Sequence, residues 1–544
     1  MAFRILDLPN ELIVSVTSHL DKSLDLQNLA LTCKRLQTLT EPSLYNNIFF
    51  RSDSQLTRLI DSIATRQHRA RSIRGIECRC LPKRWNSDIG FERLPSLLAH
   101  AVNTKDFVFE SPHCNDSKFE GHQKHARMQR AIFESMSSTS SQNISQPSLQ
   151  HLQRLTIHMN GPGSPYWTLD GNSNAIVTHP TLQELTVSCV NITVNCTANI
   201  KDNFVPTSLK KLVLDECNIT PDGLLNLLTL PKALSHLHLG ENFYNSSQFP
   251  DHIDTSFNNL FRRYPQLTMQ ALNQQSASLE SLTYVTHKGY DSQYEALNHP
   301  QPPESAFSNF GQLQDVRLIG DCRNFERAIC KNNPPPALAR LHCCGEPELL
   351  TFKLAKEHVA THNTDEYQRL VANIPFLKHT SVLPPGLKSF GLTFDRLQND
   401  WTMFAAPPPA QPFETWLATL EKLARYLLQY EAVLNVDTKH RNLWIPPLLY
   451  GEEDGIRVPL LTSDTSGAIY KAQEDWEAVY GDSDDDIDDF DEGDENTSLD
   501  GFFYDLEEDD EEDDDEDGDD DDDDDDNEDI GGDEVADFVF LTQH

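Results

Sequence analysis

The sequence predicts an α/β protein with a small N-terminal unit of three helices, an irregular repeat solenoid built around a parallel sheet, and a disordered acidic C-terminal tail. Apolar residues recur at helical spacing near the N-terminus, leucines recur at strand spacing from about residue 150, and acids accumulate near the C-terminus. With 544 residues, the chain exceeds the length at which one hydrophobic core stops growing. We therefore expect several domains or one extended repeat array.

The N-terminal helices begin in the stretch "LPNELIVSVTSHL", residues 8–20. Pro9 stands where a first-turn proline is tolerated, because the N–H that it lacks would have no helical partner. A second helix begins near Asp25, and Pro42 predicts a break before "LYNNIFF". Four aliphatic residues of the first helix share one face: Leu12, Ile13, Val16 and Leu20.

Two interpretations of this helical unit remain open at this point. So short a unit buries little apolar surface by itself, so it must pack on the next domain or on another protein. Periodicity alone favours the first interpretation, because most apolar helix faces belong to the core of their own chain.

A leucine pattern at i, i+3 and i+5 recurs further along the chain. The first four segments begin 30, 27 and 25 residues apart, close to the repeat length of about 20 to 29 residues of leucine-rich repeats. Longer gaps between the later segments indicate insertions or degenerate repeats. The segments are "LQRLTI" (152–157), "LQELTV" (182–187), "LKKLVL" (209–214), "LSHLHL" (234–239), "LESLTY" (279–284), "LQDVRL" (313–318), "LARLHC" (338–343) and "LKSFGL" (387–392).

Each segment predicts a short strand with a buried side. The middle and last apolar positions are two residues apart and face the same side of a strand, while the first leucine closes the turn that leads in. The clearest unit is "LKKLVLDECNITPDGLLNLL" (209–228), in which a helix begins at Thr220-Pro221-Asp222. We expect any substrate-binding residues to lie on the opposite, concave side of the strands, at positions such as Thr186, Val213 and His238.

The C-terminal region is dominated by acids. The stretch from Asp482 to Asp537 holds 36 of the 85 acidic residues and no Lys or Arg, so the rest of the chain is close to neutral. Such a segment is too charged and too poor in apolar residues to fold. It either solubilises the chain or binds basic surfaces such as histones.

These patterns divide the chain into five parts. The predicted boundaries are 1–50 for the helical unit, 51–148 for a linker in which the first degenerate repeats could begin, 149–404 for the leucine-rich-repeat solenoid, 405–480 for a C-terminal cap with a helix over 413–434, and 481–544 for the disordered acidic tail.

Other features argue against secretion, membrane insertion and catalysis. Asp7 and Glu11 do not fit a signal peptide, no apolar run reaches a membrane span, and the eleven scattered cysteines fit reduced thiols in the cytoplasm or nucleus. The spacing of Cys78 and Cys80 is too tight for a common zinc knuckle. No P-loop, GxSxG or HExxH motif occurs, so we expect no catalytic residue, metal or cofactor. The basic stretch 66–74 fits a solvated face, a nuclear-import patch or attraction to the acidic tail.

The N-terminal residues resemble those of F-box proteins that carry leucine-rich repeats. The family order of a Leu-Pro-x-Glu start, spaced aliphatics, a Cys-Lys-Arg-Leu stretch and a closing Leu-Tyr is present. The matching residues are Leu8, Pro9, Glu11, Leu12, Ile13, Val16, Leu20, Leu26, Leu29, Leu31, Cys33, Lys34, Leu36, Leu44 and Tyr45.

This resemblance implies a non-catalytic substrate receptor of a Skp-cullin-F-box ubiquitin ligase. The F-box would bind a Skp-type adaptor and through it the cullin-RING scaffold, while the repeats would bind a protein substrate; no membrane or direct nucleic-acid contact is expected. The alternative is an acidic nuclear binding or chaperone-like protein for basic partners. The implied adaptor-binding residues are Leu8, Pro9, Leu12, Ile13, Val16, Leu20, Leu26, Leu29 and Leu36.

Overall fold

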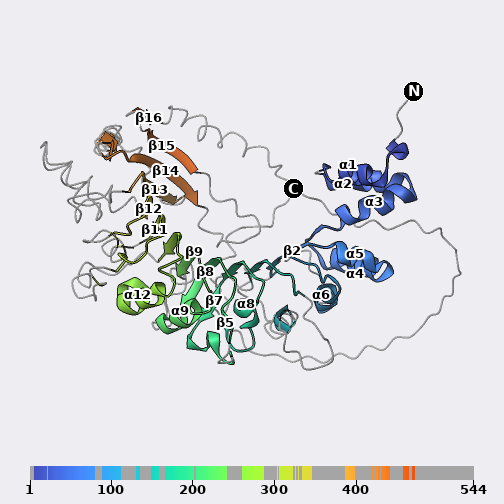
Figure 1. Ribbon diagram of the computed structural model, residues 1–544, viewed down its shortest axis with the longest axis horizontal. Coiled ribbons are helices and arrows are strands. Elements are labelled where there is room, and N and C mark those ends of the chain that lie inside the picture. The colour runs from blue at the N-terminus through green and yellow to red at the C-terminus, as the bar shows by residue number, and fades with distance from the viewer. Residues whose placement is uncertain are drawn as a thin grey trace, which may run out of the picture. The chain divides into compact units, whose positions relative to one another are not determined.

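The fold is described by a computed structural model (Figure 1). The described residues all belong to one compact unit, and residues 472–544, which include the whole predicted acidic tail, lie outside the described residues. Apart from isolated stretches of one to three residues, the described ranges are 5–20, 22–79, 89–111, 149–158, 166–200, 204–241, 260–286, 306–320, 334–345, 386–397, 430–441, 457–464 and 468–471.

The predicted N-terminal helices are confirmed. A 3-10 turn at Ile5–Asp7 precedes α1 (Asn10–Thr17), α2 (Ser23–Thr32) and α3 (Lys34–Leu44). Cys33 has extended backbone angles and separates α2 from α3. Both α1 and α2 pack against α3, so α3 is the centre of the unit.

Pro42 does not break the helix as expected, because α3 continues through it to Leu44. A proline inside a helix removes one N–H, which here would have bonded the carbonyl of Thr38. The last turn is nevertheless closed, since the Tyr45 N–H donates to the Glu41 carbonyl at 3.0 Å. Pro42 itself is exposed, so its ring enters no packed core.

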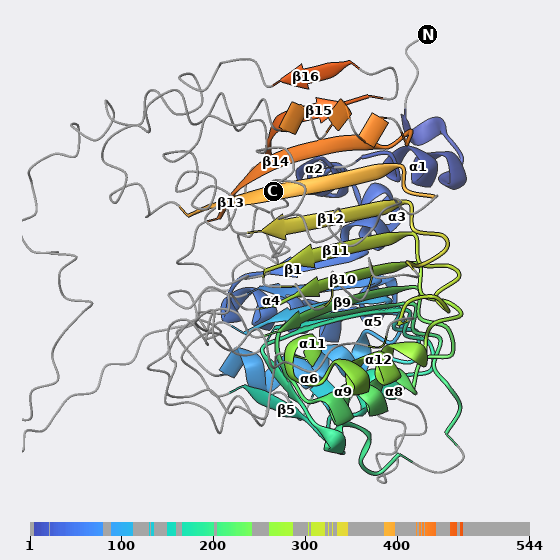
Figure 2. The same cartoon turned by 90° about the vertical axis from the view of Figure 1, so that its left-hand side faces the viewer.

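A largely parallel sheet follows the helices, as the sequence predicts. Its strands pair in chain order, and Figure 2 shows β9 to β14 side by side in that order. The last two strands, β15 (Arg457–Ser463) and β16 (Ile469–Lys471), are antiparallel. The parallel strands are β1 (Asn47–Phe50), β2 (Gly75–Arg79), β3 (Asp106–Glu110), β4 (Arg154–His158), β6 (Glu184–Ser188), β8 (Lys211–Ile219), β9 (His236–Glu241), β10 (Ser281–Val285), β11 (Asp315–Ile319), β12 (Arg340–Gly345), β13 (Ser389–Leu397) and β14 (Val433–Arg441).

All eight predicted leucine segments contribute a strand to this sheet. The middle leucines stand in register and are at most 2 % exposed, for example in the ladder Leu155, Leu185 and Leu212. The leucine three residues before each of these, such as Leu152 or Leu182, is equally buried beneath the turn. Period-two alternation therefore places one side of every strand in a continuous core.

Helices occupy several of the connections between β1 and β10. In the clearest unit, Thr220 Oγ1 accepts a hydrogen bond from the Gly223 N–H and caps α9 (Pro221–Leu228), where the sequence predicted a helix start. A small second sheet of β5 (Trp167–Leu169) and β7 (Val190–Ile192) joins the end of β8. The other helices are α4 (Asp53–Thr65), α5 (Gln67–Ser72), α6 (Ile89–His100), α8 (Ala175–Thr178), α11 (Leu260–Arg263), α12 (Pro265–Asn273) and the 3-10 helix η3 (Val194–Thr197).

Two findings refine the expected element boundaries. The sheet begins at Asn47, so its first parallel strands extend into the range predicted as linker, 51–148. The helix predicted over 413–434 ends too late, because Val433 and Leu434 belong to β14. Glu431 has a φ of 61°, which is incompatible with continuing the helix, and Leu434 is drawn into the core. Residues 413–419 lie outside the described residues.

Candidate functional site

Exposed apolar side chains gather in the N-terminal helical unit. Of the eleven large hydrophobic residues exposed in the described part of the chain, seven lie between residues 5 and 31. Exposed apolar side chains that gather in one small unit are candidates for an interaction site. The seven residues are Ile5, Leu6, Leu12, Val14, Val16, Leu24 and Leu31.

The nine residues that the resemblance assigns to the adaptor divide into three groups. Pro9, Leu12 and Val16 are exposed, the two aliphatics by 51 % and 45 %. The half-buried group is Leu8, Leu20 and Leu29. The buried group is Ile13, Leu26 and Leu36, at 0 %, 7 % and 3 % exposure.

The buried group forms the core of the helical unit. Ile13 of α1 and Leu26 of α2 lie on the two helices that pack against α3, which carries Leu36. Because apolar residues recur at helical spacing, each helix has one face that packs in this core and another that faces solvent. Leu12 and Val16, four residues apart on the solvent face of α1, are therefore better placed to meet a partner than Ile13.

Arg35 is a positioning residue that sequence reasoning missed. From α3 its guanidinium donates to the carbonyls of Leu6 and Leu8, at 2.6 and 2.8 Å, and to Asn10 Oδ1 at 2.8 Å. These bonds hold the segment that leads into Pro9 against α3. The signal was present in the sequence, since Arg35 is the arginine of the Cys-Lys-Arg-Leu stretch.

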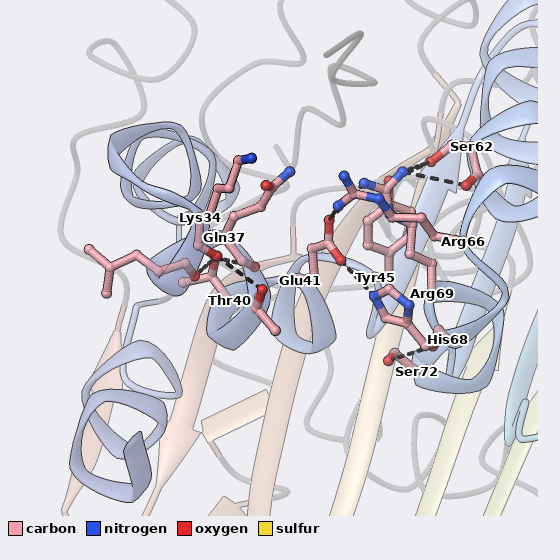
Figure 3. Close-up of polar contacts among 12 residues, drawn as sticks. Lys34, Gln37, Thr40, Glu41, Tyr45, Ser62, Arg66, His68, Arg69 and Ser72 are labelled. Carbon is pink, nitrogen blue, oxygen red and sulfur yellow. Dashed lines mark hydrogen bonds and ion pairs between the residues drawn. The ribbon is translucent and has the colours of Figure 1, made fainter. Parts of the chain in front are cut away.

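Glu41 joins the helical unit to the start of the sheet (Figure 3). Its carboxylate on α3 is only 2 % exposed and meets Arg66, His68 and Arg69, each at 2.7 Å. Arg69 also donates to Ser62 Oγ at 2.6 Å. Three members of the basic stretch 66–74 thus have a structural role, which sequence analysis did not consider.

The pKa of the Glu41 carboxyl is lowered by this cluster. Burial acts to raise the pKa, but the hydrogen bonds from Arg69 and His68 and the charges of Arg69 and Arg66 outweigh it. Glu41 is therefore ionised at neutral pH.

The side of the sheet opposite the leucines carries a second candidate surface. On each parallel strand of the main sheet from β2 to β14, one residue near the middle faces this side, and we call these residues the central row; all but one of them are half-buried. Thr186, Val213 and His238, the positions predicted for binding, are neighbours in it. The row is Glu77, Val108, Thr156, Thr186, Val213, His238, Thr283, Arg317, His342, Gly391 and Asn435, with Gly391 alone fully buried.

Charges at the strand starts on this side are paired. Arg154 donates two hydrogen bonds to Asp106 of the preceding strand, at 2.5 and 2.6 Å. Arg340 donates to Asp315 at 2.8 Å in the same way. These cross-strand pairs cancel most of the charge along this edge.

One buried pair resembles catalytic machinery in residue type only. His158 Nδ1 lies within hydrogen-bonding distance of Ser188 Oγ, and both side chains are buried. Burial lowers the pKa of His158 to about 4, so the ring is neutral. A substrate could not reach this serine, and we assign the pair to the core.

No three His, Cys, Asp or Glu side chains in the described residues are grouped as metal ligands. Cys78 is buried on β2, while Cys80 lies outside the described residues. Within the same residues, no helix has the length and apolarity to cross a membrane.

Comparisons with known proteins give a family match at the N-terminus and a structural likeness over more of the chain. A family model described as F-box-like matches residues 5–51, which contain α1, α2, α3 and β1. The N-terminal unit is therefore an F-box-like domain. A chain from the "Crystal structure of Rad7 and Elc1 complex in yeast" is similar over 59 % of this chain and 92 % of that chain, with 12 % identity and a TM-score of 0.20. No curated protein matches the sequence.

Proposed function

We propose that this protein is a substrate receptor of a Skp-cullin-F-box ubiquitin ligase. Its F-box-like domain would bind a Skp-type adaptor, and its sheet region, as an irregular leucine-rich-repeat solenoid, would bind the substrate. The observation that carries the proposal is the set of exposed apolar side chains on α1 and α2 inside the F-box-like match.

The adaptor surface would be the solvent face of these helices. Leu12 and Val16 supply apolar area, and Pro9 stands beside them at the start of α1. Proteins commonly bind a partner through the exposed apolar face of a helix, which packs into a groove of that partner. Ile13, Leu26 and Leu36 would support this face from inside rather than contact the adaptor.

The leucine ladders support the repeat architecture. Each unit buries its leucines only against its neighbours, and strands pair in chain order through the parallel part of the sheet. The half-buried central row would then be the substrate surface. Cytoplasmic or nuclear location is part of the same proposal, since the ligase acts there.

The mechanism needs no catalytic residue from this chain. A receptor that holds a substrate near a ubiquitin-loaded enzyme raises the effective concentration of the substrate's lysines. Holding the reactants in a favourable orientation lowers the entropic part of the barrier. The contacts of Glu41 would keep the adaptor-binding helices fixed relative to the first strands of the sheet.

A co-precipitation tests this function. The tagged full-length chain should retain the Skp-type adaptor, and a Leu12→Asp, Val16→Asp double variant should lose at least nine-tenths of it. The control is Val194→Asp, Val205→Asp, which changes two aliphatics far along the chain that are more exposed than Leu12 and Val16, at 54 % and 78 % exposure.

The outcome separates this function from its rival. If the full-length chain retains no adaptor, the ligase proposal is refuted. A variant truncated after residue 481 tests the acidic tail. If this variant still retains the adaptor but no longer retains basic proteins such as histones, the acidic tail has a separate binding role.

A further inference from the structure

The residues directly before the first five strands that follow β1 in the main sheet form a continuous row along one edge. The carbonyl of each row residue accepts hydrogen bonds from the next unit. For example, the Lys105 N–H donates to the Arg74 carbonyl and the Gln153 N–H donates to the Lys105 carbonyl, each at 2.7 Å. Arg74 is half-buried and the others are exposed. We call these residues the pre-strand row: Arg74, Lys105, Gln153, Gln183 and Lys210.

The pre-strand row is a different surface from the central row. Each of its members stands three residues before a member of the central row, as Gln153 does before Thr156 and Lys210 before Val213. Side chains alternate along extended backbone, so an odd separation places two residues on opposite sides. The pre-strand row therefore borders the leucine side of the sheet, where the strands begin, and lies apart from the proposed substrate surface.

The pre-strand row carries positive charge that the described residues do not neutralise. Its five members are three bases and two glutamines, with no acid. Within the described part of the chain, Arg74, Lys105 and Lys210 have no carboxylate partner. Arg74 donates instead to the carbonyls of Arg71 and Ile73, at 2.9 and 3.3 Å.

The neighbouring residues leave this charge uncompensated. The first residues of the same strands pair with one another, Arg154 with Asp106 at 2.5 Å and Lys211 with Glu184 at 3.9 Å. The five pre-strand residues that come next, from Ser235 to Lys388, include one acid and one base. The excess of three positive charges is thus confined to the first part of the edge.

The same chain holds a segment of complementary charge. Residues 482–537 contain 36 acids and no Lys or Arg, with eight consecutive aspartates at 519–526. Five adjacent strands span roughly 19 Å, which about six residues of extended chain cover. Carboxylates accept hydrogen bonds from lysine, arginine and glutamine side chains alike. A short aspartate run therefore matches the pre-strand row in length, charge and hydrogen-bonding type.

We propose that the acidic segment 482–537 of this chain binds the pre-strand row. Single exposed ion pairs are weak, but a tethered segment has an effective concentration on the order of millimolar, so several weak pairs suffice. The segment is long enough. Strand β2 is twelve strands from β16, or about 58 Å, whereas 56 extended residues span about 180 Å. The contact would shield this edge until a basic partner competes for the same acids.

Zero-length cross-linking of the full-length chain tests the contact directly. A carbodiimide joins a lysine Nζ to a carboxylate that touches it. In chains that run as monomers, we expect Lys105 and Lys210 to be joined to residues 482–537 at least fivefold more often than Lys34 and Lys388, two other exposed lysines. In about 1 M salt, where the Debye length is about 3 Å, this preference should disappear.

Binding of a labelled peptide of residues 482–537 gives a second measurement. The variant truncated after residue 481 should bind this peptide saturably at low salt. The full-length chain should bind it at least tenfold more weakly, because its own segment occupies the row. In the truncated variant, Lys105→Gln, Lys210→Gln should lower the affinity at least fivefold. The matched control Lys34→Gln, Lys388→Gln removes the same charge from exposed positions and should change the affinity less than twofold.

Several results would overturn the inference. Cross-links spread evenly over the four lysines would show attraction without a site, and cross-links only between two chains would assign the row to a second copy. Equal peptide affinity of the truncated and full-length chains would show that the row is open. Equal losses in the two double variants, each shown to fold by thermal unfolding, would exclude a specific surface. The adaptor plays no part in these measurements, so they leave the proposed function untouched.

Discussion

Glu41 on α3 and Arg69 on α5 form a buried ion pair, with 2.7 Å between Oε1 and Nη2 and side-chain exposures of 2 % and 12 %. The first residue belongs to the F-box-like domain and the second precedes β2 of the sheet. Removing one partner of such a pair leaves the other charge buried and uncompensated. The pair therefore makes the packing of α3 on α5 part of the folding free energy.

Replacing Glu41 should destabilise the protein strongly. We expect Glu41→Ala to lower the free energy of unfolding by about 3 kcal/mol, because Arg69 loses its buried partner. The control is Arg66→Ala: Arg66 contacts the same carboxylate oxygen but is 43 % exposed, so its loss should cost about 1 kcal/mol or less. Urea unfolding of the two variants measures both values, and equal losses would contradict the account.

The contribution of Glu41 should depend on pH. Its pKa is lowered on folding, so the stabilisation is fully present above the unfolded pKa of about 4.3 and is lost as the pH falls through the folded pKa. The difference in unfolding free energy between the native chain and Glu41→Gln should therefore be largest near pH 7 and shrink below about pH 4. If the difference in unfolding free energy instead grew as the pH fell, the Glu41 carboxyl would not have a lowered pKa in the folded protein.

Arg35 should affect adaptor binding more than stability. Arg35→Met removes the donors that hold the Leu6 and Leu8 carbonyls, so the segment before Pro9 loses its fixed position. Adaptor affinity should fall at least tenfold through lost preorganisation, while stability changes by about 1 kcal/mol. Arg58→Met, an exposed arginine on α4, is the control. Unchanged affinity in a folded Arg35→Met would remove the positioning role.

Gly223 in α9 should not tolerate alanine. Alanine favours helices over glycine by about 1 kcal/mol, but a Cβ here would lie 2.5 Å from the Ile192 carbonyl oxygen. Because the obstacle is backbone, the overpacking cost of about 1 to 3 kcal/mol should exceed the gain. The midpoint of thermal unfolding should therefore be lower in Gly223→Ala than in the native chain. A higher midpoint would mean that the backbone of β7 can move away from the added Cβ without a loss of stability.

Strand positions were predictable because the repeat fixes the period. The spacing of Leu155, Leu185 and Leu212 in their segments predicts that these residues lie on the buried side of strands. Thr220, followed by Pro221, predicts the start of a helix. The course of the chain at Pro42 was not predictable, because it depends on the closing bond between Tyr45 and Glu41. The end of the predicted 413–434 helix depends on the core position that Leu434 takes in β14.

The candidate surfaces were predictable only in part. A helix wheel groups Leu12, Ile13 and Val16 as apolar, but only the packing on α3 decides which of them is buried. The role of Arg35 requires contacts with residues 25 to 29 positions away in sequence. Likewise, the basic stretch containing Arg69 looked like a free charged patch until Glu41 was placed beside it.

The central claim is that the exposed face of α1 and α2 binds a Skp-type adaptor. Titration calorimetry of the purified full-length chain with purified adaptor measures it most directly. The account predicts a saturable 1:1 complex with a dissociation constant in the micromolar range or below, weakened at least a hundredfold by Leu12→Asp, Val16→Asp and unchanged by Val194→Asp, Val205→Asp. Absence of binding by the folded native chain, or equal binding by the Leu12 and Val16 double variant, would contradict it.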